Sequence, residues 1–561
     1  MNEISDIGSV RTVVQQMLQR QILDVVLSPG SRNAPFILSF NAVEDFSTQS
    51  VLDERSAGFV ALGIAQQKKK PVALSCTSGS AVANYAPALS EAYYQRIPLI
   101  AITADRPTAW IDQGEGQSIR QVGLLDNVVI ASFNLVSEQS EEDQWYNHRL
   151  VNEALETALQ EQRPVHINVP LTEPLYGVSP IEFSSSTSFK KIKTTSLPVV
   201  QEMDELKSVW GRAERIMILA TDGAGGEGFG KSLEVLADDP RIAIVTETNA
   251  NLYRMGNISC IDRTIEAFIG SKEEKEYIPD LLITIGGNVI SKKLKAMFRR
   301  HKTSIREHWH LGKEVMDTFQ SLTRVIDMAP ADLFRSFSPT SEAVADGFGV
   351  RWKARFFETE QKHQQYLQDC PYSDLKVMEL ILELVPEGAV LQMGNSSVVR
   401  YIQLFNQIRD VHYYGNRGVS GIEGCTSTAV GAAQATDRPV LLISGDQAFR
   451  YDSNALNVKD DVDNLRIIVI NNGGGNIFRI IDGPTRHEVN EGFIEKKDES
   501  SIEGLVKYHG AVYLQANDLE SLDQGLEALW SADLRGPAVL EVFTPRVESP
   551  EVLKDYFKSL R

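Results

Sequence analysis

The chain has 561 residues, which is too many for one hydrophobic core and favours about three or four domains. Its formal net charge of −19 argues against nucleic acid or an anionic membrane as the main partner. No apolar run reaches the roughly 18 residues that a membrane helix needs. The N-terminus lacks a basic stretch followed by an apolar one, and the four cysteines lack CxxC spacing, so we expect a cytoplasmic protein.

Residues 1–183 alternate short apolar runs with helix-like segments. The helix-like segments include 54–67 and 81–95, and the apolar runs are 22–30, 71–79, 98–107 and 164–170. Continuous apolar strands that alternate with helices predict a parallel sheet covered on both faces. We therefore expect a first α/β domain here, and the segment 184–198, rich in serine, threonine and lysine, predicts a linker after it.

The rest of the chain repeats this pattern twice. Residues 199–345 contain the runs RIMILATDG, RIAIVTET and DLLITIGG, which predict a second, smaller α/β domain. A polar, mainly helical connection at about 350–370 leads to a third domain over 370–561. Its apolar runs are 389–396, 439–446, 465–474 and 537–545. The expected fold class is α/β, with three doubly wound parallel-sheet domains.

The clearest chemical signal lies in the third domain. Gly445 and Asp446 end one apolar run, and Asn471 and Asn472 end the next run 26 residues later, with one crossover helix expected between them. The carboxyl ends of parallel strands meet at one edge of a sheet, so a carboxylate and an amide oxygen should converge there. With the glycine-rich turn 473–475 they suit Mg²⁺ and a diphosphate. The alternative is two ordinary turns without a ligand.

This layout resembles the signature of thiamine-diphosphate-dependent enzymes. The resemblance implies that Asp446 and Asn472 bind Mg²⁺ (or Mn²⁺) through their side chains and Gly474 through its carbonyl. It also implies pyrimidine-binding, central and diphosphate-binding roles for the three domains. The further cofactor-binding residues that it implies are Gly445, Gln447, Asn476, Ile477, Phe478 and Ile422, the last propping the bent cofactor. Gln447 stands where the family usually has a small residue, and Ile422 could equally be a core aliphatic side chain.

The same chemistry needs a carboxylate at N1′ of the cofactor's aminopyrimidine. Glu54 is the candidate, because it follows a short β-like segment and begins a helix. An acid at a helix N-terminus also interacts favourably with the helix dipole, which is the alternative explanation for it. Enzymes of this superfamily build each site from two chains, so the resemblance implies a homodimer, either alone or as half of a dimer of dimers.

Five further segments narrow the resemblance: LSPGSRNAP (27–35), ITADRP (102–107), GEGQSIRQ (114–121), GNSSVVRY (394–401) and GNRGVSGIEG (415–424). They resemble the 2-succinyl-5-enolpyruvyl-6-hydroxy-3-cyclohexene-1-carboxylate synthase family of menaquinone biosynthesis, more than acetohydroxyacid synthase or pyruvate decarboxylase. That family decarboxylates 2-oxoglutarate and adds the resulting carbanion to isochorismate. Both substrates are dianions, so basic residues must converge on the cleft.

The resemblance assigns this substrate-binding work to a set of polar and basic residues from all three domains: Ser31, Arg32, Arg106, Gln117, Lys292, Lys293, Ser396, Arg400 and Arg417. Lys293 departs from the family, which more often has arginine there. Taken alone, any one of these arginines could be a solvated surface charge.

One motif competes with this interpretation. GGEGFGKS (225–232) matches the P-loop pattern, follows an apolar run and would make the chain an NTPase with Lys231 and Ser232 at the phosphates. The segment lacks a partner strand that ends in aspartate. An ordinary glycine-rich connection explains the motif equally well. A non-catalytic relative that keeps the fold is a third possibility, against which the intact Glu54, Asp446 and Asn472 count.

Overall fold

The computed structural model describes residues 3–181, 183, 189, 191, 200–224, 228–253, 256–339, 346–458, 462–481 and 484–561. The predicted linker 184–198 lies almost entirely outside these residues, as does the segment 225–227 of the P-loop-like motif. Within the described part of the chain, no helix combines the length and the apolar character needed to cross a bilayer.

The first sheet has six parallel strands in the order β3-β2-β4-β5-β7-β6. Its strands are β2 (Asp24–Leu27), β3 (Ser47–Ser50), β4 (Val72–Cys76), β5 (Leu99–Asp105), β6 (Ala131–Asn134) and β7 (Val165–Pro170). One face packs on α1 (Gly8–Gln19), α2 (Ala34–Ala42) and α6 (Glu141–Glu161), and the other on α3 (Glu54–Lys68), α4 (Ser80–Asn84) and α5 (Ala86–Gln95). A short antiparallel pair, β1 (Glu3–Ser5) with β8 (Val178–Pro180), lies beside it.

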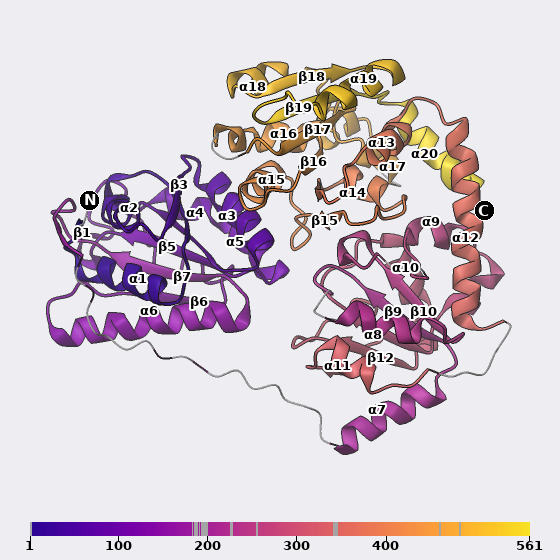
Figure 1. Cartoon of the computed structure of the whole chain (residues 1–561), viewed down its shortest axis with the longest axis horizontal. Coiled ribbons are helices and arrows are strands. Elements are labelled where there is room, and N and C mark those ends of the chain that lie inside the picture. Colours follow the sequence, from indigo (N-terminus) through magenta and orange to yellow (C-terminus); the bar gives the residue numbers. More distant parts are fainter. Residues whose placement is uncertain are drawn as a thin grey trace.

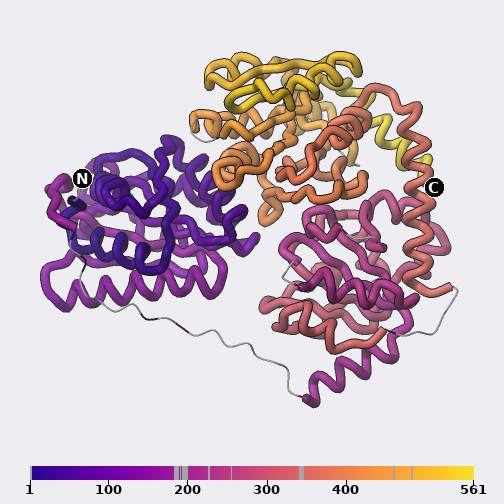
Figure 2. The backbone as a smooth tube through the Cα atoms, viewed as in Figure 1, coloured from indigo at the N-terminus to yellow at the C-terminus, as the bar shows by residue number. Residues whose placement is uncertain are grey.

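The second sheet has five parallel strands in the order β10-β9-β11-β12-β13. They are β9 (Ile216–Ala220), β10 (Ile242–Thr246), β11 (Leu281–Ile285), β12 (Glu307–Leu311) and β13 (Arg324–Ile326). The accompanying helices are α7 (Val200–Arg212), α8 (Phe229–Leu236), α9 (Ile261–Glu266), α10 (Lys292–Arg300) and α11 (Pro330–Arg335). The long helix α12 (Phe348–Gln368) then forms the predicted helical connection, and Figure 2 shows the chain returning through it to the third domain.

The third sheet again has six parallel strands, in the order β15-β14-β16-β17-β19-β18. They are β14 (Val390–Met393), β15 (His412–Tyr414), β16 (Val440–Gly445), β17 (Leu465–Asn471), β18 (Val512–Ala516) and β19 (Ala538–Phe543). Its helices are α13 (Asp374–Glu383), α14 (Ser397–Ile402), α15 (Cys425–Gln434), α16 (Asp446–Tyr451), α17 (Ile477–Ile480), α18 (Glu503–Tyr508), α19 (Leu519–Leu529) and α20 (Glu548–Ser559). Three parallel-sheet α/β units confirm the predicted fold class, while the domain limits 1–183, 199–345 and 370–561 stay predictions.

The connection between β16 and β17 differs from the single crossover helix expected there. The six-residue α16 is followed by a separate 3₁₀ turn over Ser453–Asn457. Asp452, at the break, accepts hydrogen bonds from the backbone N–H and the hydroxyl of Ser427. Aspartate, serine and asparagine side chains compete with the helical backbone for hydrogen bonds, and three of them in a row (452–454) end the helix.

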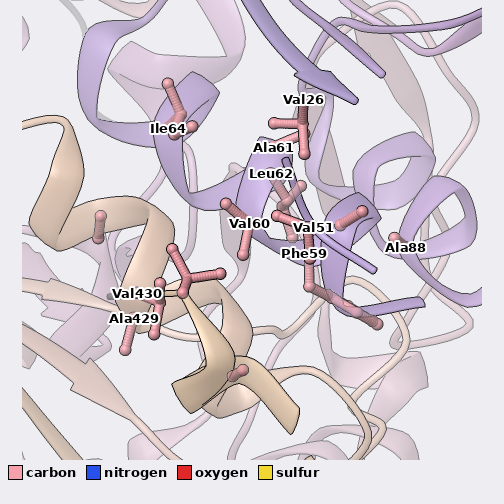
Figure 3. Packing of buried hydrophobic residues seen from close by; sticks show 14 of the residues in the cluster. Val26, Val51, Phe59, Val60, Ala61, Leu62, Ile64, Ala88, Ala429 and Val430 are labelled. Atoms are coloured by element: carbon pink, nitrogen blue, oxygen red, sulfur yellow. The ribbon is translucent and has the colours of Figure 1, made fainter. Parts of the chain in front are cut away.

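The first and third domains share a hydrophobic core through α3 and α15 (Figure 1). Figure 3 shows Val60 of α3 beside Ala429 and Val430 of α15. The two helices approach closely at two glycines. A Cβ on Gly63 would lie 2.1 Å from the carbonyl oxygen of Thr428, and one on Gly431 would lie 2.0 Å from that of Val60. The contact between these helices therefore fixes how the outer domains sit against each other.

The substitution Gly63→Ala tests this contact. The added methyl group meets backbone atoms that cannot rotate away, so we expect a loss of about 1–3 kcal/mol of stability and a lower Tm. The matched control is Gly211→Ala on α7, where a Cβ would meet no described atom within 4 Å. That variant should keep or slightly raise the Tm, because alanine favours helices. Equal Tm values for the two variants would contradict the close approach of α3 and α15.

Candidate active site

A cavity of about 170 Å³ opens at the carboxyl edge of the third sheet. Its walls come from the ends of β14, β16 and β17 and from the turns that follow them. Nearly all the predicted cofactor-binding residues line it together with one predicted substrate residue: Ser396, Ile422, Gly445, Asp446, Gln447, Asn472, Gly474, Asn476, Ile477 and Phe478. Parallel pairing explains the convergence, since β16 and β17 run in register, with Gly445 opposite Ile470.

Two of the three proposed metal ligands, Asp446 and Asn472, present a side-chain oxygen without a described hydrogen-bond partner. The third, the carbonyl of Gly474, accepts the N–H of Asn476 at 2.8 Å. Asp446 is 2 % exposed, and its Oδ2 atom is buried without a hydrogen-bond partner among the described residues. Burial raises the pKa of this carboxyl to about 7. Asn472 donates from Nδ2 to Asp374 at 2.9 Å, which leaves its amide oxygen for a ligand. A buried carboxylate without a partner is costly unless a cation joins it, so this group fits Mg²⁺.

The turn after β17 has a backbone conformation that only glycine adopts easily. Gly474 has a φ of +138°, and a Cβ there would lie 3.1 Å from the carbonyl oxygen of Glu495. The next residue, Gly475, donates its N–H to the same carbonyl at 2.7 Å. Asn476 follows with both side-chain polar atoms buried and without a described partner. These unpaired groups beside the metal ligands fit the oxygens of a diphosphate.

Gln447, the departure from the family pattern, has a contact of its own. Its side-chain amide donates to the carbonyl oxygens of Glu495 at 2.7 Å and Lys496 at 2.9 Å. The carboxylate of Glu495 in turn forms ion pairs at 2.9 Å with Arg479 and Arg546. Gln447 therefore holds the backbone of residues 495–496, which lies against the glycine turn, and a small residue could not form these hydrogen bonds.

Asp374 is a site residue that the sequence did not predict. It is buried at the start of α13 and accepts hydrogen bonds from Asn472 and, at 2.6 Å, from the hydroxyl of Thr544. Ser373 and Asp374 look like an ordinary helix start in the sequence, and 98 residues separate Asp374 from Asn472. Its effect is to orient the amide of Asn472, as carboxylates do for many metal ligands.

The predicted substrate residues of the first domain form a separate cluster. Arg32 is buried and donates to the carbonyl of Leu171 at 2.6 Å and to Glu173 at 2.9 Å. Arg106 forms a longer ion pair with the same Glu173, at 3.5 Å. Two guanidinium groups thus share one carboxylate, which is 66 % exposed. Ser31 and Gln117 are both exposed. Ser31 directly precedes Arg32, and Gln117 follows Gly116, whose carbonyl accepts a hydrogen bond from Arg106.

A second basic cluster lies where the third domain meets the central one. Arg417 donates to Asn395 at 2.8 Å, its Nε is buried without a described partner, and burial lowers the pKa of its guanidinium. Arg400 donates to the carbonyl of Ser396, and burial lowers its pKa as well. Ser396 has a φ of +71°, a strained conformation typical of functional sites.

The two predicted lysines of α10 differ from each other. Lys293 forms an ion pair with Glu266 and lies 3.3 Å from the ring centre of Phe557, so its ammonium is already paired with protein groups. Lys292 is exposed at the first position of the helix. The structure therefore offers Lys292 more readily than Lys293 for a substrate.

Glu54 does not line the cavity within one chain. It begins α3 and accepts a hydrogen bond of 3.3 Å from Asn84. Its neighbours Asp53 and Arg55 contact Asn454 and the carbonyl of Tyr451 in the third domain. Among the described residues, no hydrogen bond or ion pair joins the Arg32–Arg106 cluster to the Arg400–Arg417 cluster. Within the described part of one chain, Glu54 and the two basic clusters are therefore not joined by such contacts.

Comparisons with known proteins identify the family. The model for the N-terminal TPP-binding domain of thiamine pyrophosphate enzymes matches residues 9–124, and the model for the C-terminal TPP-binding domain matches 392–542. The 2-succinyl-5-enolpyruvyl-6-hydroxy-3-cyclohexene-1-carboxylate synthases of Flavobacterium johnsoniae and Christiangramia forsetii are 40% and 39% identical, each over 99% of both chains. That of Porphyromonas gingivalis is 37% identical over 99% of this chain and 98% of its own. The chain belongs to this synthase family.

Membership confirms the sequence-based recognition and makes the chain a thiamine-diphosphate-dependent enzyme. The NTPase alternative is not supported, because both matched models describe thiamine pyrophosphate binding. In the described part of the P-loop-like motif, the hydroxyl of Ser232 donates to the carbonyl of Phe229 at 2.7 Å and is buried. That hydroxyl therefore forms a hydrogen bond within α8 and does not serve as a metal ligand.

The substitution Asp374→Asn tests the support given to Asn472. Without the carboxylate, the Asn472 amide loses its orientation, so we expect the affinity for thiamine diphosphate at fixed Mg²⁺ to fall by roughly tenfold or more. Quenching of tryptophan fluorescence during cofactor titration measures this. Asp452→Asn, at an equally buried aspartate that does not line the cavity, should keep wild-type affinity. Unchanged affinity in Asp374→Asn would remove Asp374 from the site.

Proposed function

We propose that the chain decarboxylates 2-oxoglutarate and adds the resulting carbanion to isochorismate, forming 2-succinyl-5-enolpyruvyl-6-hydroxy-3-cyclohexene-1-carboxylate and CO₂. The observation that carries the proposal is the cavity at the ends of β16 and β17. There, Asp446, with one oxygen that has no partner among the described residues, lies among the other residues that the resemblance assigns to the cofactor. The full-length relatives that bear this synthase name support the same reaction.

The metal is part of the proposal. Asp446, Asn472 and the carbonyl of Gly474 would hold Mg²⁺, or Mn²⁺, which accepts the same oxygen ligands. The side-chain amide of Asn476, which has no described partner, would bind the diphosphate of the cofactor. When bound, thiamine diphosphate supplies the group that attacks the keto carbon and stabilises the negative charge left by decarboxylation. Ile422, Ile477 and Phe478 line the cavity with apolar surface, which limits water near that charge.

The basic residues would bind the four carboxylates of the two substrates. Burial lowers the pKa of Arg400 and Arg417 through desolvation. Pairing with a substrate anion would offset this free-energy cost of burying the two positive charges. Arg32 and Arg106 already share Glu173, a geometry that a substrate carboxylate could adopt in place of that exposed side chain. Charge-assisted pairs of this kind supply both affinity and orientation.

We also propose that the functional unit is a homodimer, in which Glu54 reaches the cavity of the partner chain. The support is that Glu54 does not line the cavity of its own chain and that no hydrogen bond or ion pair among the described residues joins the two basic clusters. Burial of Glu54 against the cofactor would favour sharing of a proton with N1′. Four buried cysteines without disulfides are typical of a reducing compartment, which agrees with a cytoplasmic location.

A reconstitution assay tests the proposed reaction. With thiamine diphosphate, Mg²⁺, 2-oxoglutarate and isochorismate, the purified protein should release CO₂ and form the coupled product. Pyruvate in place of 2-oxoglutarate should give little turnover, because it lacks the second carboxylate with which the proposed basic residues would pair. Thiamine diphosphate with Mg²⁺ should raise the Tm, whereas ATP with Mg²⁺ should not. Turnover with pyruvate alone would favour an acetohydroxyacid-synthase-like reaction, and a Tm shift with ATP alone would favour an NTPase.

A further inference from the structure

The segment 415–424, which carries Arg417 and Ile422, is held by side chains from all three domains. Asn395, on the third domain, donates from Nδ2 to the carbonyls of Asn416 at 2.8 Å and Gly421 at 2.6 Å. Asn288, on the central domain, donates to the carbonyls of Arg417 at 3.0 Å and Gly418 at 2.7 Å. The first domain adds a third contact, through Glu91 of α5. We name the segment 415–424 the arginine loop.

Glu91 makes the most specific of these contacts. One carboxylate oxygen accepts the N–H of Gly418 at 2.5 Å, and the other accepts the N–H of Val419 at 2.7 Å. The side chain is 2 % exposed, and burial raises the pKa of its carboxyl. A Cβ on Gly418 would lie 2.7 Å from the backbone oxygen of Glu91, so the glycine permits the close approach. Two donors held by one carboxylate fix both the position and the direction of the loop.

A chain of amides continues from Glu91 into the interface between the outer domains. Gln95 donates to Glu91 at 2.5 Å and to the carbonyl of Gly415 at 3.2 Å. Gln66 of α3 donates to Gln95 at 3.3 Å and accepts from Gln392 of β14 at 2.9 Å. The network therefore joins α5 and α3 of the first domain to the arginine loop and β14 of the third domain. Buried polar networks of this kind specify one arrangement of the elements that they join.

The Arg417 guanidinium makes a single hydrogen bond among the described residues, although the nearby carboxylates of Glu247 and Glu91 also attract it. One nitrogen donates to Asn395 at 2.8 Å, while Nε is buried without a partner in the described chain. The backbone of residues 416–419, from which this side chain extends, thus helps to set the position of the guanidinium. A shift of the loop would move the charged group away from a substrate carboxylate even if every side chain of the site remained present.

We propose that Glu91 is a positioning residue for substrate binding, which acts on Arg417 through the backbone of the arginine loop. The proposal rests on the proposed function and deepens it. The position of Arg417 therefore depends on how the first domain packs on the third domain of the same chain. A purely structural Glu91 would lower stability when replaced and leave the substrate KM unchanged.

The test is Glu91→Gln, which replaces one acceptor oxygen by an amide group that faces an N–H. We expect KM for one of the two substrates to rise by roughly tenfold or more, with kcat changed much less. The affinity for thiamine diphosphate should stay unchanged. The effect should shrink in an Arg417→Lys background, because both changes act on the same interaction. Peptides covering 415–424 should also exchange their amide hydrogens faster than in the wild type.

Glu156→Gln is the matched control. Glu156 is also a buried carboxylate of the first domain, and it accepts the N–H of Lys191 at 3.2 Å and pairs with Arg20. It should lower the Tm without changing KM or the exchange of 415–424. A KM in Glu91→Gln equal to that of the control, or an equal effect of Glu91→Gln in the Arg417→Lys background, would overturn the proposal.

Two further arms keep the result decisive. If Glu91→Gln does not fold, Asn288→Ala removes a second support of the arginine loop from an exposed position and should give the same rise in KM. An unchanged KM in that variant would overturn the proposal.

If the wild type does not turn over 2-oxoglutarate and isochorismate, the proposed function fails. Hydrogen exchange of 415–424 still decides the role of Glu91, and unchanged exchange in Glu91→Gln would refute it.

Discussion

Two neighbouring parallel strands place Asp446 and Asn472 at the same sheet edge, and the rest of the site depends on that placement. The aspartate carboxylate is buried, and one of its oxygens has no partner among the described residues, while the asparagine amide is held by a second buried carboxylate, Asp374. A buried carboxylate with an unpaired oxygen, such as that of Asp446, does not stabilise the fold, because removing the charge from water is costly. The glycine turn, the Gln447 contact and the apolar cavity walls all support a cation and a diphosphate at this edge.

The second constraint is the close packing of α3 and α15, where Gly63 and Gly431 allow backbone to meet backbone. This contact joins the first and third domains of one chain, and the polar network of Glu91 lies beside it. Yet the same arrangement leaves Glu54 away from the cavity of its own chain. The intrachain interface thus holds the arginine loop, whereas we propose that a second chain completes the site.

Much of this could be predicted from the sequence because the signals are local. Buried strands such as β4 and β17 are continuous apolar runs, and the residues that end β16 and β17 carry their chemistry with them. The sequence indicates only a short β-like segment near β3, and it does not predict the edge strands β6, β15 and β18, which are short and partly polar. Asp374 and Glu91 escaped prediction for another reason: their partners lie 98 and 327 residues away, and only tertiary packing brings them together. The expected crossover helix was wrong because turn-forming residues at 452–454 end α16 early.

The central claim is that each site combines Asp446 of one chain with Glu54 of the other. The most direct test is co-expression of Glu54→Gln and Asp446→Asn chains that carry different affinity tags, followed by purification of the mixed dimer. Each variant alone should be inactive. In the mixed dimer, one of the two sites carries both changes and the other carries neither, so activity should return. A mixed dimer as inactive as its parents would show that both residues act within a single chain and would contradict this account.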